Sequence, residues 1–383
     1  MEICNYTNCS GCSLCALVCP HTAIKMEADK EFFLRPVIDE NKCISCGACS
    51  AKCPANRQDE SSMLSAFAAY NNSPDIRRNS SSGGIFHALA TEILEKSGIV
   101  FGVGFDIENT ACHMAIESAE ELDSIMRSKY MQSSKKDIYK KVKDALKNGR
   151  PALFCGTPCE CSALSSYLGK SRYGLIMMDF ICHGVQTPEI WKRYLNEKVN
   201  GNIKSINFRD KSRGWHEFSM KIETDSGSVC ESLYTNPALR IFLCNNALRP
   251  SCYNCLWKGE RSSADITVAD FWGINRAFPN MFDDKGTSAV IIRSEAGKEA
   301  FEAIKDKLTY RECSPKTVAE LNPALYHSAT MPKTRDDFFA MLSDGSDYDA
   351  IARRFGAPMS AKNIFRERLA CFVKKILAII KKR

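Results

Sequence analysis

Cysteine is the residue type whose number and spacing point to chemistry in this sequence. The 383 residues include 20 cysteines, and nine of them lie within residues 1–53. The start of the chain shows neither the basic nor the apolar stretch of a secretory signal, so we do not expect a disulfide framework. Clustered cysteines in a protein that is not exported are better interpreted as metal ligands or redox groups.

Eight of these nine cysteines fall into two runs with the same spacing, C-x2-C-x2-C-x3-C-P. The first run is Cys9, Cys12, Cys15, Cys19 and Pro20, and the second is Cys43, Cys46, Cys49, Cys53 and Pro54. This spacing resembles that of bacterial-type ferredoxins, in which three close thiolates hold one [4Fe–4S] cluster and the fourth crosses to the other. The rule predicts one cluster on Cys9, Cys12, Cys15 and Cys53, and a second on Cys43, Cys46, Cys49 and Cys19.

Two alternatives for these runs are weaker. Zinc prefers ligand pairs that are separated by a longer loop. Eight buried free thiols would need no metal, but two full copies of one spacing argue against them. Residues 23–26 and 33–38 are expected to form the short hairpin that such modules carry. Cys4 lies outside the pattern, and we assign it no role beyond that of a surface or buried thiol.

A second set of cysteines lies far along the chain. Cys159 and Cys182 each follow an expected strand, in Gly156-Thr157-Pro158-Cys159 and in Cys182-His183-Gly184. The ends of parallel strands lie on one edge of a sheet, where sites form in α/β proteins. Cys252 and Cys255 add a two-ligand C-x2-C segment. These four thiols could converge on a third cluster, while a zinc site and a set of inert buried thiols both stay open.

Two segments carry residues suited to phosphate or other anions. Ser81-Ser82-Gly83-Gly84 opens an expected helix, where small residues and free backbone N–H groups can hold a phosphate. Ser128-Lys129-Tyr130-Met131-Gln132-Ser133 adds a cation, hydroxyls and an aromatic ring. A capped helix start and a solvated polar turn are the respective alternatives. Two further segments, a basic turn at 209–216 and an acidic strand at 265–270, can also be interpreted in two ways. Each is either part of a ligand site or ordinary structure.

The elements that must position these residues alternate in type. Strands are expected at 66–70, 99–105, 151–154, 175–182, 203–208, 218–223, 228–233, 266–269 and 288–293. Helices are expected at 85–94, 138–146, 162–168, 189–199 and 298–307, with a capping box at Ser118 and Glu121. The pattern predicts an α+β (mixed α/β) protein. Its expected domains are a dicluster ferredoxin domain at 1–60, a larger mixed α/β domain at 61–345 and a helical tail at 346–383.

The motifs after the ferredoxin module resemble, in order, those of the beta subunit family of coenzyme F420 hydrogenases and dehydrogenases. They extend from about residue 65 to 310. Besides the segments already quoted, they include Phe208-Arg209-x-Lys211 with Gly214-Trp215, Cys252-x2-Cys255-x2-Lys258, Ala264-Asp265-Ile266-Thr267 with Asp270-Phe271-Trp272-Gly273, and Lys285-Gly286-x-Ser288. Two positions depart from the family pattern: Glu160 stands where Gln is common, and Ala269 where Gly is common.

The resemblance implies an iron–sulfur flavoprotein oxidoreductase. Electrons would pass between [4Fe–4S] clusters and an FAD that exchanges hydride with a small organic donor or acceptor. It implies a third [4Fe–4S] cluster on Cys159, Cys182, Cys252 and Cys255. The implied FAD contacts are Ser82, Gly83, Gly84, Lys129, Tyr130, Gln132, Ser133 and Thr157. Similar proteins occur beside polysaccharide biosynthesis genes in bacteria, which suggests a link to that process.

The resemblance leaves the rest of the reaction open. Lys129, Arg209 and Lys211 are candidates for anionic groups of the flavin or the substrate. No catalytic residue is assigned, since His183 and His216 are as well explained by structural roles. A ferredoxin-type or other redox partner is expected. The alternative is a non-catalytic electron-transfer subunit that serves a separate enzyme, and bound flavin would distinguish the two.

Charge is concentrated in the last residues. Residues 361–383 carry five Lys, three Arg and one Glu, so their charge of +7 equals that of the whole chain. An apolar stripe at helical spacing accompanies it, formed by Phe365, Leu369, Phe372, Val373, Ile376 and Ile380. Such a helix lies on an anionic membrane surface or docks on its own domain. We therefore expect a cytoplasmic protein, peripheral at the membrane if the tail binds there, and no nucleic-acid partner, because residues 1–360 have no net charge.

Overall fold

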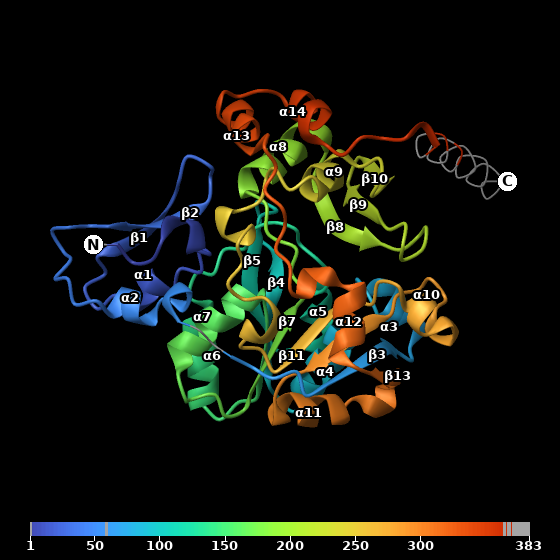
Figure 1. The fold of residues 1–383 in the computed structure, drawn as a ribbon, viewed down its shortest axis with the longest axis horizontal. Coiled ribbons are helices and arrows are strands. Elements are labelled where there is room, and N and C mark those ends of the chain that lie inside the picture. Colours follow the sequence, from blue (N-terminus) through green and yellow to red (C-terminus); the bar gives the residue numbers. More distant parts are fainter. Residues whose placement is uncertain (1, 58–59, 363–364, 366–368, 370–383) are drawn as a thin grey trace. The chain divides into compact units, whose positions relative to one another are not determined.

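The computed structural model describes residues 2–57, 60–362, 365 and 369. The chain divides into two compact units (Figure 1). The first unit comprises Met1–Pro188 and Leu248–Thr330, and the second comprises Glu189–Ala247 and Met331–Arg383. The boundaries of these two units differ from those of the three domains expected from the sequence. The three domains stay a prediction.

The N-terminal part of the first unit is a small module of two short helices and a hairpin. Helix α1 (Leu14–Val18) and helix α2 (Ala48–Lys52) each begin within one of the cysteine runs. Strands β1 (Ile24–Ala28) and β2 (Leu34–Ile38) pair in antiparallel fashion between them. The hairpin expected from the sequence is thereby confirmed, and Figure 1 shows it beside the two helices.

The two cysteine runs repeat a left-handed backbone conformation as well as a spacing. Gly11 and Ser45 both precede the second cysteine of their run, with φ of 67° and 55°. Ser13 and Gly47 both precede the helix that carries the third cysteine, with φ of 65° and 74°. Because serine adopts this conformation at one position of each pair, the backbone geometry alone does not require glycine there.

The larger part of the first unit is an eight-stranded mixed sheet with the order β13-β3-β12-β11-β7-β6-β4-β5. Strands β4, β6, β7 and β11 are mutually parallel, and the outer pairs are antiparallel. The strands are β3 (Ser65–Asn71), β4 (Ile99–Phe105), β5 (Ala111–Ile116), β6 (Ala152–Cys155), β7 (Leu175–Phe180), β11 (Ile266–Asp270), β12 (Ser288–Ile292) and β13 (Leu308–Cys313). The mixed α/β fold class is therefore confirmed.

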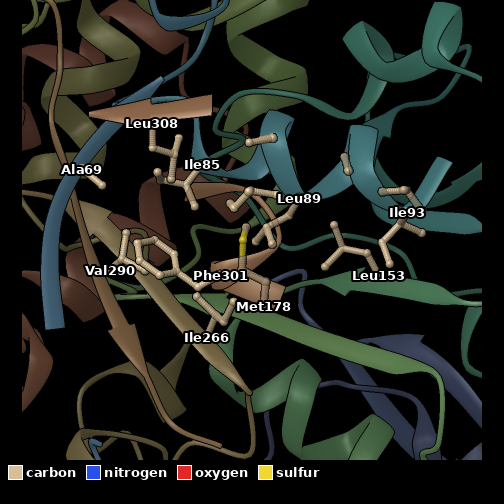
Figure 2. Packing of buried hydrophobic residues seen from close by; sticks show 14 of the residues in the cluster. Ala69, Ile85, Leu89, Ile93, Leu153, Met178, Ile266, Val290, Phe301 and Leu308 are labelled. Carbon is tan, nitrogen blue, oxygen red and sulfur yellow. The ribbon is translucent and has the colours of Figure 1, made fainter. Parts of the chain in front are cut away.

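Helices cover both faces of the parallel strands. On β6, Leu153 packs with α4 (Ile85–Glu95), whereas Phe154 packs with α6 (Ile138–Lys147) and α7 (Pro158–Leu168). Strand side chains alternate between faces, so each parallel strand contributes to two cores. Figure 2 shows the first core, in which Leu89, Met178, Val290 and Phe301 meet. The helices not yet named are α3 (Pro74–Asn79), α5 (Leu122–Ile125), α10 (Ile274–Ala277), α11 (Glu295–Glu302) and α12 (Pro315–Leu321).

The cysteine module packs on the second of these cores. Leu14 of α1 and Cys12 lie among the buried side chains of α6 and α7. The Ser166 hydroxyl of α7 donates to the carbonyl oxygen of Lys52, and the Lys52 ammonium donates to the carbonyl oxygen of Ser166. The module and the sheet are thus joined by both apolar and polar contacts within one unit.

Most of the expected elements are present, but several short helices and two strands were not expected. These strands, β5 and β13, both lie at the edges of the sheet. The side chain of Ser118 makes no capping hydrogen bond, so the capping box expected there is wrong. A capping box does form at the start of α7, between Thr157 and Glu160. Helix α7 therefore begins four residues earlier than expected.

The elements named in the described part of the second unit are a three-stranded antiparallel sheet and four helices. The sheet has the order β10-β9-β8. Its elements are β8 (Ile203–Asp210), β9 (Ser219–Thr224), β10 (Gly227–Ser232), α8 (Pro188–Lys198), α9 (Pro237–Leu243), α13 (Arg335–Ser343) and α14 (Tyr348–Phe355). Apart from Phe365 and Leu369, the apolar stripe expected in the tail lies outside the described residues. Over the described part of the chain, we find no helix with the length and apolar character to cross a membrane.

Candidate iron–sulfur centres

The two cysteine runs line two separate cavities, each with thiols from both runs. We call the first the inner cavity: it is lined by Cys9, Cys12, Cys15 and Cys53, together with Cys4. We call the second the outer cavity: it is lined by Cys19, Cys43, Cys46 and Cys49. The crossing cysteine of each run therefore lies with the other run, as the ferredoxin spacing requires.

The thiols surround space instead of converging on a point. Among the described residues, no three His, Cys, Asp or Glu side chains gather closely enough to form a site for a single metal ion. The four cysteines predicted for each cavity form a donor set that suits an iron–sulfur cluster. The assignment of individual ligands stays a prediction.

Electrostatic interactions shift the pKa values of thiols in the inner cavity. A hydrogen bond from Cys4 and the charge of Arg249 lower the pKa of Cys9 to about 5, against the effect of burial. Burial raises the pKa of Cys12 to about 11. The outer cavity is more open to solvent, since Cys46 is exposed and Ile44 beside it is 63% exposed.

Arg249 connects the inner cavity with the second set of cysteines. Its guanidinium is 1% exposed and donates to the carbonyl oxygens of Cys9 and Leu34, at 2.8 Å each. It also donates to Oε1 of Gln132 at 2.8 Å. The carbonyl oxygen of Arg249 accepts from the backbone N–H of Cys252 at 2.9 Å. Arg249 thus contacts the loop of Cys9 with its side chain and the loop of Cys252 with its backbone.

Cys159, Cys182, Cys252 and Cys255 all lie in the first unit, and their assignment to one cluster stays a prediction. Cys159 follows β6 and Cys182 follows β7, and these two strands are parallel neighbours. Burial raises the pKa of Cys159 and Cys182, and charge on Cys255 would raise both further. Burial likewise raises the pKa of Cys252 to about 11, with a further contribution from Cys255. We call these four residues the sheet-edge thiols.

The segments that carry the sheet-edge thiols are held by backbone and side-chain contacts. Gln186 bridges to Met131 on one side and to Leu248 on the other, so three segments form a ribbon. A Cβ on Gly184 would lie 3.0 Å from Leu248 and 3.2 Å from Cβ of Cys252, so this close approach favours glycine. The Lys258 ammonium donates to the carbonyl oxygen of Cys182 at 2.6 Å, which brings a cation beside the thiols.

A buried charge cluster lies at the start of α7, next to Cys159. Glu160 pairs with Lys135 at 2.6 Å and accepts from the Ser133 hydroxyl at 3.0 Å and the Thr157 backbone N–H at 2.8 Å. Burial by itself would raise the pKa of Glu160, but Lys135 and His113 hold it at about 2. Burial lowers the pKa of His113 to about 4. Glu160, which stands where the family commonly has Gln, is therefore paired with a buried cation, Lys135.

The structure brings together only part of the predicted FAD contacts. The backbone N–H of Ser128 donates to the Ser81 hydroxyl at 3.1 Å, so the segments 81–84 and 128–133 meet. Gly84 is the N-cap of α4, with φ of 87°. Lys129 lies in the same place, and its ammonium donates to the carbonyl oxygen of Met126 at 2.5 Å. Burial lowers the pKa of Lys129 to about 7.

Other predicted FAD contacts make different bonds. The Gln132 amide donates to the carbonyl oxygens of Ser10 and Gly11, at 3.3 and 3.4 Å. The Ser133 hydroxyl belongs to the buried cluster around Glu160. The Ser82 hydroxyl donates to the carbonyl oxygen of Thr287, and the backbone N–H of Gly83 donates to the Ser288 hydroxyl. Thr157 caps α7 and lies 3.0 Å from the Cys159 sulfur, while Tyr130 accepts from the backbone N–H of Gln186.

The remaining candidates have mainly structural contacts. Asp265 accepts from the backbone N–H of Met177 and the hydroxyl of Ser294, so it supports neighbouring strands. Arg209 and Lys211 belong to the second unit, where Arg209 lies 3.9 Å over the ring of Phe218. His216 packs edge-on against Trp215 in that unit. His183 follows Cys182 in the first unit.

The sequence analysis did not identify Arg249 or Lys135. Arg249 stands three residues before Cys252, but a single arginine beside a C-x2-C pair carries no signal of its own. Lys135 follows the Ser128–Ser133 motif by two residues. The position of Glu160, where the family commonly has Gln, was the one available hint of a buried countercharge.

Comparisons with known proteins agree with this arrangement. Residues 149–317 match the family described as the C terminus of the coenzyme F420 hydrogenase/dehydrogenase beta subunit. Two families, each described as a 4Fe-4S dicluster domain, match residues 8–57 and 35–85. The matches overlap over residues 35–57, and residues 58–85 contain no cysteine, so both describe one module.

Similarity to curated and solved proteins is more distant. No curated protein matches the chain. A chain of the F420-reducing [NiFe] hydrogenase complex from Methanosarcina barkeri, solved as a xenon derivative, is 15% identical, with a TM-score of 0.47. The alignment covers 79% of this chain and 97% of that chain. From the family matches, the protein is an iron–sulfur redox protein with an N-terminal 4Fe-4S dicluster domain, and its residues 149–317 match the coenzyme F420 hydrogenase/dehydrogenase beta subunit family.

Proposed function

We propose that the protein is an iron–sulfur flavoprotein oxidoreductase. It would hold two [4Fe–4S] clusters in the inner and outer cavities, a third on the sheet-edge thiols, and one FAD. Together, these groups would convert between single-electron transfer and hydride transfer. A small organic molecule would donate or accept the hydride. The link to polysaccharide biosynthesis stays a prediction.

The observation that carries this proposal is the position of the sheet-edge thiols relative to the inner cavity. Arg249 contacts Cys9 with its side chain and Cys252 with its backbone. Glu160, which follows Cys159 in the chain, pairs with the buried Lys135. Two sets of thiols that are connected through one buried residue, Arg249, suit electron transfer between two bound clusters.

The outer cavity supplies the partner-facing end of this route. Cys46 is exposed, and Ile44, which lines the same cavity, is largely exposed. A ferredoxin-type or other redox partner would therefore exchange electrons with the cluster held by Cys19, Cys43, Cys46 and Cys49. The inner cavity, which Arg249 contacts, would then connect that cluster with the sheet-edge thiols.

The residues around Ser81 and Lys129 are suited to hold the anionic part of FAD. Ser81 and Ser128 join two loops at the start of α4, and Lys129 supplies a buried ammonium there. The side-chain oxygens Oε1 of Gln186 and Oγ1 of Thr187 are buried with no hydrogen-bond partner among the described residues. Unsatisfied buried acceptors of this kind suit the binding of a further polar group.

The test is anaerobic purification of the full chain with counts of iron, sulfide and flavin. Three cubanes call for about twelve irons, from four per cluster, and one FAD. Cys252→Ser should lose about four irons and keep the spectroscopic signals of the other two clusters. Cys313→Ser is the matched control, because Cys313 lies on edge strand β13 and is not a predicted ligand. About eight irons in the unchanged protein would contradict the third cluster.

The flavin count separates the proposal from its alternative. A non-catalytic electron-transfer subunit needs clusters but no flavin. Absence of FAD from protein that contains its full iron would therefore favour that alternative. Flavin bound at one per chain and lost in Lys129→Met, with iron unchanged, would favour the oxidoreductase.

A further inference from the structure

Cys4 lies in the inner cavity although it belongs to neither cysteine run. The cavity is lined by five thiols, those of Cys9, Cys12, Cys15 and Cys53 and that of Cys4. The outer cavity is lined by four. A [4Fe–4S] cluster uses four thiolate ligands. The inner cavity therefore has one thiol more than the cluster expected there can use.

The position of Cys4 is fixed by the surrounding chain. The amide of Asn56 donates to the carbonyl oxygen of Ile3 at 2.8 Å, which ties the segment before Cys4 to the end of the second cysteine run. The guanidinium of Arg35 donates to the carbonyl oxygen of Tyr6 at 2.6 Å, which ties the segment after it to the β1–β2 hairpin. Ile3 is buried, and Cys4 packs against the same small core as Cys15 and Cys53. The N-terminal segment is thus anchored on both sides of Cys4.

Cys4 has two specific neighbours in the cavity. Its side chain lines the cavity together with Cys9 and Cys53, and it packs against the small core that contains Cys53. Cys9 comes from the first run and Cys53 is the crossing cysteine of the second. Cys4 therefore lies between the two chain segments that must both reach the inner cluster.

We propose that Cys4 is a reserve ligand of the inner [4Fe–4S] cluster, able to take the place of Cys9 or Cys53. In this exchange the Cys4 thiol releases its proton to solvent, and its sulfur forms a bond to the iron that the other cysteine has left. The displaced sulfur takes up a proton. No electron is transferred, so the oxidation state of the cluster does not change. The inference depends on the dicluster module and is independent of FAD and of the third cluster.

The repeat within the module provides a matched test. Cys53 and Cys19 are the crossing cysteines of the two runs, but only the cavity of Cys53 is lined by a fifth thiol. Full-length variants Cys53→Ala, Cys19→Ala and Cys4→Ala/Cys53→Ala would be purified anaerobically. Iron and sulfide would be counted, and electron paramagnetic resonance would report both [4Fe–4S] signals and any [3Fe–4S] signal.

The proposal expects Cys53→Ala to keep the iron content of the unchanged protein and to show no [3Fe–4S] signal. Cys19→Ala and the double variant should each lose between about one and four irons, the range from a [3Fe–4S] product to a lost cubane. Cys4→Ala alone should keep its full iron content. Equal iron loss in Cys53→Ala and in the double variant would overturn the proposal.

The same purified variants also provide a control for folding. The signal of the outer cluster reports whether the module has folded in each inner-cavity variant. Cys9→Ala provides an independent second variant, because Cys4 lines the same cavity as Cys9 and Cys53. If neither Cys9→Ala nor Cys53→Ala accumulates while Cys19→Ala does, Cys4 does not act as a ligand and the proposal fails.

Discussion

Nη2 of Arg249 lies 3.8 Å from the sulfur of Cys9, and its Nε donates a 2.8 Å hydrogen bond to the carbonyl oxygen of the same residue. A positive charge and a hydrogen bond near a cluster sulfur favour the reduced, more negative state of the cluster. We therefore predict that Arg249→Gln shifts the midpoint potential of the inner cluster to a more negative value, measured by an anaerobic redox titration. Arg249→Lys should shift it less, since the charge stays.

The control for this experiment is another buried arginine of the same unit. Arg77 pairs with Asp283 and lies over Tyr70, apart from the inner cavity. Arg77→Gln should leave the potential of the inner cluster unchanged. An unchanged potential in Arg249→Gln would show that Arg249 acts as a structural contact alone.

Gly11 is expected to tolerate no side chain, for a reason that lies outside its own loop. A Cβ on Gly11 would lie 2.4 Å from Nε2 of Gln132 and 2.7 Å from Nη1 of Arg249. Ser45 holds the equivalent left-handed position of the second run with a side chain present. We predict that Gly11→Ala lowers the melting temperature and broadens the inner-cluster signal. Ser45→Ala should change neither the melting temperature nor the cluster signal. Equal effects in both variants would show that the backbone conformation, and not the contact with Gln132 and Arg249, requires glycine at position 11.

The ion pair between Glu160 and Lys135 should contribute strongly to stability. Both side chains are buried, so Glu160→Gln leaves a buried ammonium without its partner. Removing one member of a buried pair typically destabilises a protein by about 3–5 kcal/mol. Denaturant unfolding of the holoprotein should show a loss of that order. The double variant Lys135→Met/Glu160→Gln should recover much of it, whereas an additive loss would indicate that the two residues act independently.

Lys129 should make stability depend on pH in the neutral to alkaline range. Burial lowers its pKa to about 7, below the value of 10.5 for an unperturbed lysine. Below pH 7 the folded protein must hold a buried charge, and this penalty decreases as pH rises from 7 toward 10 because the folded state then binds fewer protons than the unfolded state. In flavin-free protein, Lys129→Met should therefore be more stable than the unchanged protein at pH 6.5, with the difference smaller at pH 9. Melting temperatures at the two pH values would measure this, and a constant difference would contradict the burial of the charge.

The local patterns predicted much of the fold and of the candidate site. Both cysteine runs, the hairpin between them and the strands of the parallel sheet are encoded in short segments, where spacing and alternation of apolar residues are visible directly. The expectation that Cys159 and Cys182 share a sheet edge followed from two apolar runs of strand length. Edge strand β13 was missed because most of its residues are exposed, which weakens the apolar pattern, whereas β5 is mostly buried and was missed although most of its residues are apolar. The capping box was placed at Ser118 instead of Thr157 because both segments have the same local signature.

The sequence by itself determined which cysteines form the ferredoxin repeat, because that information lies in spacing along the chain. Only the tertiary structure decided what surrounds them. Arg249 follows Cys9 by 240 residues and Gln132 follows Gly11 by 121, yet they meet at one cavity. Cys4, which carried no sequence signal, became a fifth thiol there because Asn56 and Arg35 hold its segment in place. Contacts between distant segments depend on the packing of the whole unit, and no local pattern encodes them.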